Sequence, residues 1–171
     1  MDSNILLFIQ EYIRNPITDP FFKFITLLGN GGAIWILCTI LLLLFKKTRK
    51  IGFMCAIALL ASLVLNNLIL KNLIARARPY DMIQGLKILV EAPTDFSFPS
   101  GHTASSFAAA TVLFLTLPKK YGIPALVLAA LMGFSRLYIG VHYPTDVLAG
   151  LISGVLIALV TVIAFKKLCH K

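Results

Sequence analysis

The sequence predicts an all-α integral membrane protein: a helical bundle of five transmembrane helices, preceded by a short N-terminal interfacial helix. Hydrophobic residues make up 58% of the 171 residues and charged residues 13%, which places the chain outside the ordinary soluble classes. Several apolar runs reach about 20 residues, the length at which a helix crosses a bilayer. A chain of this length accommodates one domain, so residues 1–171 are expected to form a single membrane-embedded domain.

The first element is predicted to be a short helix within residues 1–16. Ile5 and Ile9 belong to an apolar set at roughly helical spacing, while Glu11 lies on the polar side. The segment is too short to span a bilayer, so we expect it to lie in the membrane interface. Pro16 ends it.

Five apolar segments follow and are predicted to span the membrane. The first contains the glycine segment, residues 29–32, which we expect to serve close helix packing, with an access path for a substrate as the alternative. Asn66 and Asn67 lie in the second span and should hydrogen-bond to neighbouring helices, because lipid offers no partner. The predicted spans cover residues 21–45, 51–75, 101–117, 123–138 and 144–165.

The charge distribution predicts the orientation. Alternating spans place the basic clusters at residues 46–50, 119–120 and 166–171 on one side, and all seven acidic residues on the other. Basic clusters mark the cytoplasmic side, so residues 76–99 and 135–146 should face outward. The same clusters explain the net charge of +9, and we therefore expect no nucleic-acid partner.

Residues 135–146 place ionisable groups between two apolar runs, where such groups are costly and mark functional sites by default. His142 and Asp146 are four residues apart, so the carboxylate can hold one ring nitrogen, fix the tautomer and free the other nitrogen to attack or to take a proton. The guanidinium of Arg136 suits a phosphate. A structural ion pair that caps two membrane helices is an equally open alternative for these residues alone.

Two further polar clusters fall on the same predicted side. Lys71 and Arg78 follow the second span, and residues 100–102 open the third. A phosphate group would explain their convergence, because three cations can neutralise a dianionic phosphoryl group without a metal ion. The exposed N–H groups at a helix start also favour an anion. The chain lacks a carboxylate cluster that would hold a metal, so we expect no cofactor.

Two histidines can then divide the chemistry. Neutral His142 would attack phosphorus, with Asp146 stabilising the positive charge that develops on its ring. His102, at the positive start of a helix, would protonate the departing alkoxide. A phosphohistidine would form, and water would hydrolyse it.

The three polar clusters together resemble the signature motifs of the type 2 phosphatidic acid phosphatase family, which extends to bacterial lipid phosphatases and vanadium-dependent haloperoxidases. The resemblance covers about residues 70–150, and the order and spacing of the motifs match without a gap. In this sequence the motifs are Lys71 followed after six residues by Arg78-Pro79, then Pro99-Ser100-Gly101-His102, and then Ser135-Arg136 followed after five residues by His142 and after three more by Asp146.

The resemblance implies a helical bundle, metal-independent hydrolysis of a phosphomonoester or pyrophosphate, and a histidine nucleophile. It also implies that His102 is the acid and that His142 with Asp146 forms the nucleophilic pair. Members commonly have six spans, whereas five plus the short N-terminal helix are predicted here. The residues that it implies bind phosphate are Lys71, Arg78, Ser100, Gly101 and Arg136.

The expected function is therefore dephosphorylation of a lipid at the outer face of a bacterial plasma membrane, with the lipid tail remaining in the bilayer. Phosphatidylglycerol phosphate, phosphatidate and undecaprenyl pyrophosphate are the candidate substrates. The main alternative is a transporter or flippase that binds anionic headgroups without hydrolysis. A vanadate-holding pocket and a purely structural bundle are weaker alternatives, and the oligomeric state is left open.

Four charged residues of the loop outside the motifs are expected to be solvated: Arg76, Lys87, Glu91 and Asp95. For Arg76, a position facing the lipid headgroups is equally expected, and a substrate contact is the alternative. Tyr143 adjoins the predicted nucleophile and is expected either to line the pocket or to pack beside it.

Overall fold

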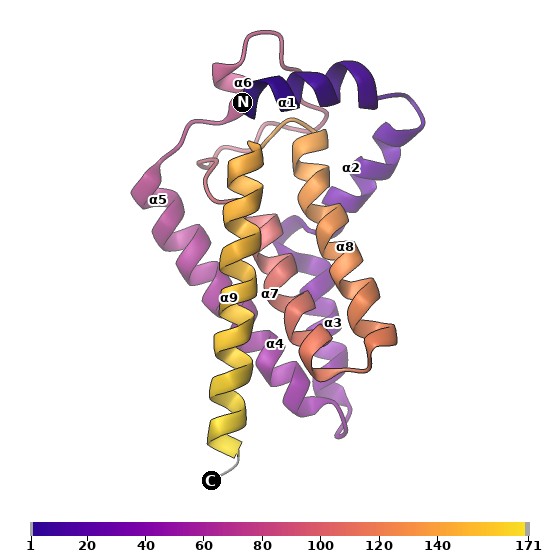
Figure 1. Ribbon diagram of the computed structural model, residues 1–171, viewed down its shortest axis with the longest axis vertical. Helices are drawn as coiled ribbons and strands as arrows, with labels where there is room; N and C mark the ends of the chain where they lie inside the picture. Colours follow the sequence, from indigo (N-terminus) through magenta and orange to yellow (C-terminus); the bar gives the residue numbers. More distant parts are fainter. Residues whose placement is uncertain (1, 170–171) are drawn as a thin grey trace.

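The computed structural model describes residues 2–169, and every regular element in that range is helical, which confirms the all-α prediction (Figure 1). In chain order the elements are α1 (Asp2–Phe8), the π-helix η1 (Ile9–Ile13), α2 (Thr18–Leu28), the 3-10 helix η2 (Asn30–Gly32), α3 (Ala33–Leu44), α4 (Arg49–Ser62), the π-helix η3 (Leu63–Leu70), α5 (Lys71–Ile74), α6 (Pro79–Met82), α7 (Gly101–Thr116), α8 (Lys119–Tyr138) and α9 (Pro144–Cys169).

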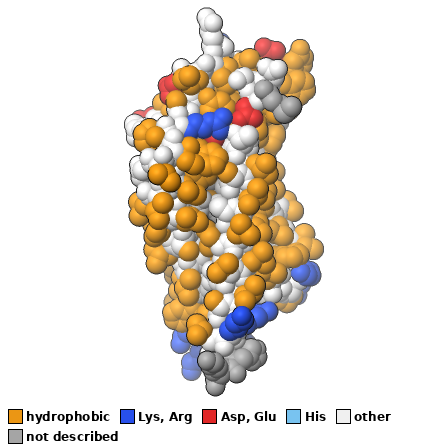
Figure 2. All heavy atoms as spheres, turned by 60° about the vertical axis from the view of Figure 1, so that its left-hand side comes forward, with side chains coloured by type: hydrophobic (Ala, Val, Ile, Leu, Met, Phe, Trp, Pro, Cys, Tyr) orange, Lys and Arg blue, Asp and Glu red, His pale blue; other side chains and the backbone are white. Residues whose placement is uncertain are grey.

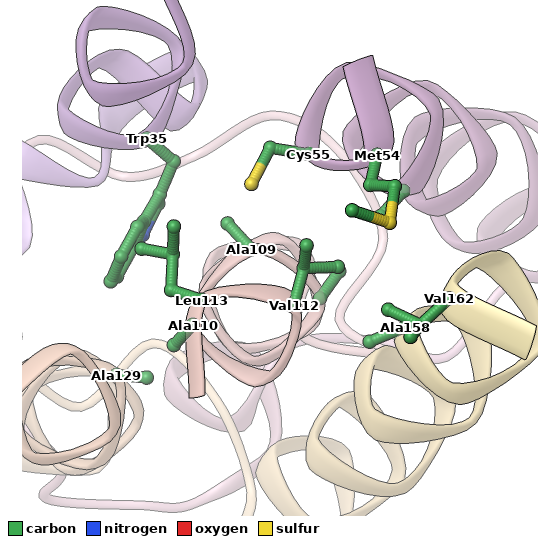
Figure 3. Close-up of a cluster of buried hydrophobic side chains, with 12 residues drawn as sticks. Trp35, Met54, Cys55, Ala109, Ala110, Val112, Leu113, Ala129, Ala158 and Val162 are labelled. Carbon is green, nitrogen blue, oxygen red and sulfur yellow. The ribbon is translucent and has the colours of Figure 1, made fainter. Parts of the chain in front are cut away.

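Helix α7 forms the centre of the bundle and packs against α9, α8 and α4. Small side chains let these helices approach closely. A Cβ added to Gly154 of α9 would lie only 2.5 Å from the carbonyl oxygen of Ala104 on α7. Figure 3 shows α7 surrounded by the other helices, with Trp35 from α3 and Ala158 from α9 directed toward it. The central position of α7 places its first turn inside the bundle rather than in lipid.

The helices meet the expectation of a multi-pass membrane protein. Three are long and apolar enough to cross a bilayer, Arg49–Met82, Lys119–Tyr138 and Pro144–Leu168, and a fourth crossing results if the bent pair α2 and α3 is one span. Helix α7 has 16 residues, or roughly 24 Å at 1.5 Å per residue, which is less than a hydrocarbon core of about 30 Å. The number of five spans therefore stays a prediction.

The predicted first span is not one straight helix. Its halves, α2 and α3, meet at an angle of 49° across the glycine segment. Gly31 (φ 59°) and Gly32 (φ 74°) adopt left-handed conformations there, which residues with a Cβ reach only at a cost. The break is thus encoded by the glycines themselves.

The N-terminal helix lies across one end of the bundle (Figure 1). Leu6 and Ile9 are buried beneath it, while Phe8 and Tyr12 on another side are exposed. Arg14, just after the helix, donates from Nε to the carbonyl oxygen of Tyr138 over 2.6 Å. Contacts with the protein therefore hold one face of this helix. Its position in the membrane interface stays a prediction.

The two ends of the molecule differ in charge, as predicted. Figure 2 shows several Lys and Arg side chains near one end, a wide belt of hydrophobic side chains, and the Asp and Glu side chains near the other end, where basic side chains also lie among them. The loop between α3 and α4 and the loop between α7 and α8 lie at the basic end, whereas α1, α6 and the turn from α8 to α9 lie at the acidic end (Figure 1). The segregation agrees with the alternating topology, and the assignment of the basic end to the cytoplasm stays a prediction.

A buried amide joins two helices in the apolar belt. Asn66 is fully buried, and its Oδ1 accepts a hydrogen bond of 2.8 Å from Oγ of Ser153 on α9. Its Nδ2 donates to the carbonyl oxygen of Ser62, 3.2 Å away on its own helix. The expected interhelical hydrogen bond is thus confirmed for Asn66.

Candidate active site

A cavity of about 1030 Å³ brings the three polar clusters together near the acidic end of the bundle. Among the predicted site residues, it is lined by Lys71, Arg78, Gly101, His102, Arg136 and His142. Both histidines thus face one space. Asp146 and Ser100 are fully buried and do not line the cavity. Asp146 lies beside His142, and the backbone of Ser100 is hydrogen-bonded to that of Asp146.

His142 lies in the turn between α8 and α9, and 1% of its surface is exposed. Its Nδ1 is 3.4 Å from Oδ2 of Asp146, close enough for charge interaction but not aligned as a hydrogen bond. Its Nε2 lies 3.5 Å from Nη1 of Arg78, one of the cations predicted to bind phosphate. The ring of His142 therefore lies between the carboxylate of Asp146 and the guanidinium of Arg78, as the prediction requires.

The environment of His142 favours the neutral ring. Burial lowers the pKa of the imidazole, and the nearby charges of Arg136 and Arg78 lower it further, while Asp146 opposes them; the resulting pKa is about 3. The ring is then uncharged at neutral pH, which is the form that can attack phosphorus.

Asp146 is held by several donors at once. Its Oδ2 accepts from Oγ of Ser97 over 2.5 Å and from the backbone N–H of Tyr143 over 2.9 Å. Its Oδ1 accepts from Nη1 of Arg76 over 2.6 Å. These bonds fix the carboxylate beside His142 and keep it ionised although it is fully buried.

Arg76 is only partly solvated: 32% of its side chain is exposed, and its guanidinium is paired within the protein. Besides Asp146, its guanidinium binds the carboxylate of Asp2 at 3.3 Å and lies 3.8 Å from the centre of the Tyr143 ring. Tyr143 does not line the cavity; it packs with Leu6 and Leu86 in a small apolar cluster. Arg76 thus ties the N-terminal helix to the carboxylate beside His142. No spacing rule could have indicated this, because Arg76 and Asp146 are 70 residues apart in the chain.

Asp95 also departs from the expectation of a solvated loop residue. Its carboxylate accepts from Nη2 of Arg78 over 2.5 Å and forms a hydrogen-bonded ion pair with Nζ of Lys71. Burial acts to raise the pKa of this carboxyl, but the hydrogen bonds and charges of Lys71 and Arg78 outweigh burial and hold the pKa at about 2. Asp95 is therefore an anion that forms ion pairs with the two cations that were predicted to bind phosphate.

Replacing Asp95 by asparagine is expected to strengthen anion binding. A phosphate must compete with the Asp95 carboxylate for the same donors, and the amide removes that competing charge. Because Asp95 is half-exposed, we expect a gain of only about tenfold, equivalent to ~1.4 kcal/mol. The inhibition constant of inorganic phosphate measures it. Asp81→Asn, an exposed carboxylate outside this cavity, is the matched control. Unchanged or weaker inhibition in Asp95→Asn would show that the carboxylate does not compete.

Arg136 and His102 also line the cavity and lie close to each other. Arg136 is buried on α8, and its Nη1 donates to Oγ1 of Thr26 over 2.5 Å. The same Nη1 lies 3.4 Å from Nε2 of His102. Nε of Arg136 has no hydrogen-bond partner among the described residues, which leaves a buried donor for an anion.

The start of α7 fits closely against its neighbours. Ser100 caps the helix: its Oγ accepts from Oγ1 of Thr103 over 2.9 Å. The backbone N–H of Ser100 donates to the carbonyl oxygen of Asp146 over 3.1 Å. A Cβ at Gly101 would lie 2.6 Å from Oδ1 of Asn67. Glycine at this position therefore allows the helix start to approach η3, in addition to leaving room for an anion.

The cavity has a second, apolar part. Ile36 of α3 lines it together with Leu60 and Leu63 from α4 and η3, and all three are also exposed on the molecular surface. The glycine segment also lines the cavity, and its use as an access path for a substrate stays a prediction. The same cavity is lined by cations and by apolar side chains that are exposed on the molecular surface.

Comparisons with known proteins agree with this architecture. Residues 50–168 match the PAP2 superfamily. An undecaprenyl-diphosphatase of Sulfolobus acidocaldarius is 40% identical over 129 residues, which cover 75% of this chain and 62% of that relative; the chain therefore spans less than two thirds of the relative's length.

Two solved structures resemble the fold. The structure of Aquifex aeolicus LpxE has a TM-score of 0.84 at 28% identity, covering 94% of both chains. A transmembrane PAP2 type phosphatidylglycerolphosphate phosphatase from Bacillus subtilis has a TM-score of 0.77 at 30% identity, covering 97% of this chain and 85% of the other. The matched residues 50–168 include all three polar clusters, and their side chains converge on one cavity. The chain belongs to the PAP2 superfamily.

Proposed function

We propose that this protein is a lipid phosphatase that hydrolyses a phosphomonoester or pyrophosphate of a lipid at the extracytoplasmic face of the membrane. The observation that carries the proposal is the composition of one cavity. Its lining combines Lys71, Arg78, Arg136 and two histidines with apolar side chains that are exposed on the molecular surface. A phosphorylated lipid has the matching distribution of charge and apolar surface.

The reaction begins when Nε2 of neutral His142 attacks phosphorus. The bond between phosphorus and the leaving oxygen breaks, and His102 gives its proton to that oxygen. Lys71, Arg78 and Arg136 stabilise the charge on the other phosphoryl oxygens. Water then attacks the phosphohistidine with His102 as the base, which releases phosphate and restores the imidazole.

The transporter or flippase alternative accounts for cations at the cavity but gives no role to a neutral, buried histidine with a carboxylate behind it. The relative from Sulfolobus acidocaldarius carries the name of a diphosphatase, and one of the similar structures that of a phosphatase. Both names favour hydrolysis. The candidate substrates remain phosphatidylglycerol phosphate, phosphatidate and undecaprenyl pyrophosphate.

The proposal is tested by phosphate release from purified protein in detergent, with these three lipids and water-soluble phosphomonoesters as the panel. We expect release from at least one lipid and a much lower kcat/KM for soluble esters, because these cannot use the apolar part of the cavity. Binding of the lipids without release would favour the transporter.

Arg136→Ala is expected to lower kcat at least about 10²-fold, as loss of one oxyanion donor does. Arg136 is buried at the site and carries a free Nε donor in the described structure, so its loss leaves the phosphoryl charge poorly compensated. Steady-state kinetics on the best lipid of the panel measures the effect. Lys87→Ala, which removes an exposed cation that does not line the cavity, should leave kcat unchanged. A loss below threefold in Arg136→Ala would remove Arg136 from the site.

A further inference from the structure

The glycine segment brings to the cavity a side chain that the mechanism above does not use. Asn30 lines the cavity, and its Oδ1 lies 3.0 Å from Nε2 of His102. We propose that Asn30 is a positioning residue for the general acid: it accepts a hydrogen bond from Nε2–H of His102 in its imidazolium form and so stabilises the proton that His102 gives to the leaving oxygen. This inference rests on the proposed function.

Arg136 creates the need for such an acceptor. Its Nη1 lies 3.4 Å from the same Nε2. A guanidinium carries only N–H donors, so it favours a ring whose Nε2 is unprotonated and whose proton is on Nδ1. The carbonyl oxygen of an amide has the opposite preference, because it can only accept. Of these two neighbours, the side chain of Asn30 is the one that places the proton where the leaving oxygen can take it.

The backbone around Asn30 is adapted to this placement. Gly31 (φ 59°) and Gly32 (φ 74°) turn the chain through left-handed conformations that favour glycine. A Cβ at Gly29 would lie 2.7 Å from Cδ2 of His102 and 2.5 Å from Sδ of Met132. The three glycines therefore let the end of α2 approach the His102 ring closely, and among residues 29–32 only Asn30 has a side chain to place beside it.

A hydrogen bond fixes this turn relative to His102. Trp35, one turn into α3, donates from Nε1 to Oγ of Ser106 on α7 over 2.8 Å, and both residues are buried. Since α7 also carries His102, the segment with Asn30 and the helix with the acid form one packed unit. The contact between Asn30 and His102 is thus set by the fold and does not depend on a free loop.

A purely structural Asn30 makes a different prediction. If it only stabilised the turn, its loss would impair every substrate alike. If it positions the acidic proton, its loss matters only where the leaving group needs that proton. The leaving group of a lipid monophosphate is an alkoxide, which needs that proton. The leaving group of para-nitrophenyl phosphate is a stable phenolate, which does not need it.

The experiment compares Asn30→Ala and Asn30→Asp with the wild type on these two substrates in detergent. In Asn30→Ala we expect kcat for the lipid to fall tenfold to about 10²-fold, part of the ~10²–10⁴ that general acid catalysis supplies, with KM nearly unchanged and little loss on the nitrophenyl ester. In Asn30→Asp the carboxylate favours a protonated His102, so the basic limb of the pH–rate profile should move to higher pH. Asn72→Ala is the control, because Asn72 is exposed and its side chain donates to Leu68 on its own helix.

An equal loss on both substrates in Asn30→Ala, or an unmoved basic limb in Asn30→Asp, would overturn the positioning role. The pH profile of Asn30→Asp decides the question alone if Asn30→Ala proves too unstable to purify. If the wild type releases phosphate from neither substrate, the proposed function fails first. That result is distinguishable, since it does not depend on any variant.

Discussion

Replacing His142 with alanine is expected to abolish phosphate release, with kcat reduced roughly 10⁴-fold or more, as for loss of a nucleophile in other enzymes with a covalent intermediate. The ring is buried, neutral at physiological pH and directed at the cations by Nε2, and the cavity lining offers no equivalent second nucleophile backed by a carboxylate among the described residues. Binding of inorganic phosphate should survive, because Lys71, Arg78 and Arg136 remain.

The measurement is lipid-phosphate turnover together with inhibition by, or direct binding of, inorganic phosphate. His142→Gln provides a bulkier replacement that guards against collapse of the buried turn. Turnover near the wild-type rate in both variants would remove the assignment of His142 as the nucleophile. Loss of both binding and turnover would instead point to a folding defect, which a thermal unfolding curve detects.

Asp146→Asn is expected to have the second-largest effect, a loss in kcat of up to about 10⁴-fold, the cost of the equivalent change in a hydrolase triad. The amide keeps the shape of the carboxyl but removes the charge that stabilises the ring of His142 during attack. It also leaves Arg76 without the partner that it binds at 2.6 Å. KM should change little, because Asp146 does not line the cavity.

Asp81→Asn is the matched control for this variant, since Asp81 is exposed and outside the active-site cavity. A change in KM with kcat preserved would contradict the proposed role of Asp146 and place it in substrate binding instead. If kcat and KM were the same in the two variants, the Asp146 carboxylate would be a structural group only.

The motif residues could be predicted from the sequence because each lies beside a span end. Span length and alternation place Lys71, His102 and His142 at the same end of any bundle with this topology, and the cavity confirms that they meet. The helix start at Gly101 was equally accessible, since a serine cap before a glycine and an apolar run is a local signal.

Arg76, Asp95 and Ser97 could not be predicted in the same way. They lie in irregular chain, where no periodicity tells which way a side chain points, and their partners are far away in the sequence. An ion pair such as Arg76 with Asp146 depends on the packed arrangement of the loop, α9 and the N-terminal helix. The composition of the loop indicated only that its charges should be accessible to water.

The break in the first span could be predicted only in part. The glycine segment was visible in the sequence, but apolar length alone suggested one span. The left-handed conformations of Gly31 and Gly32, and the contact of Asn30 with His102, follow only from the folded chain. The glycines inside the span thus indicated an unusual backbone conformation, but they did not show which residues it would bring together.

The central claim is that His142 becomes covalently phosphorylated. Rapid mixing of the wild type with a substrate labelled with ³²P in its terminal phosphate, followed by quenching in alkali, tests it directly. The account predicts an acid-labile, base-stable label that maps to the peptide containing His142 and is absent from His142→Ala. Turnover of the wild type with no trapped label, or a label on another residue, would contradict it.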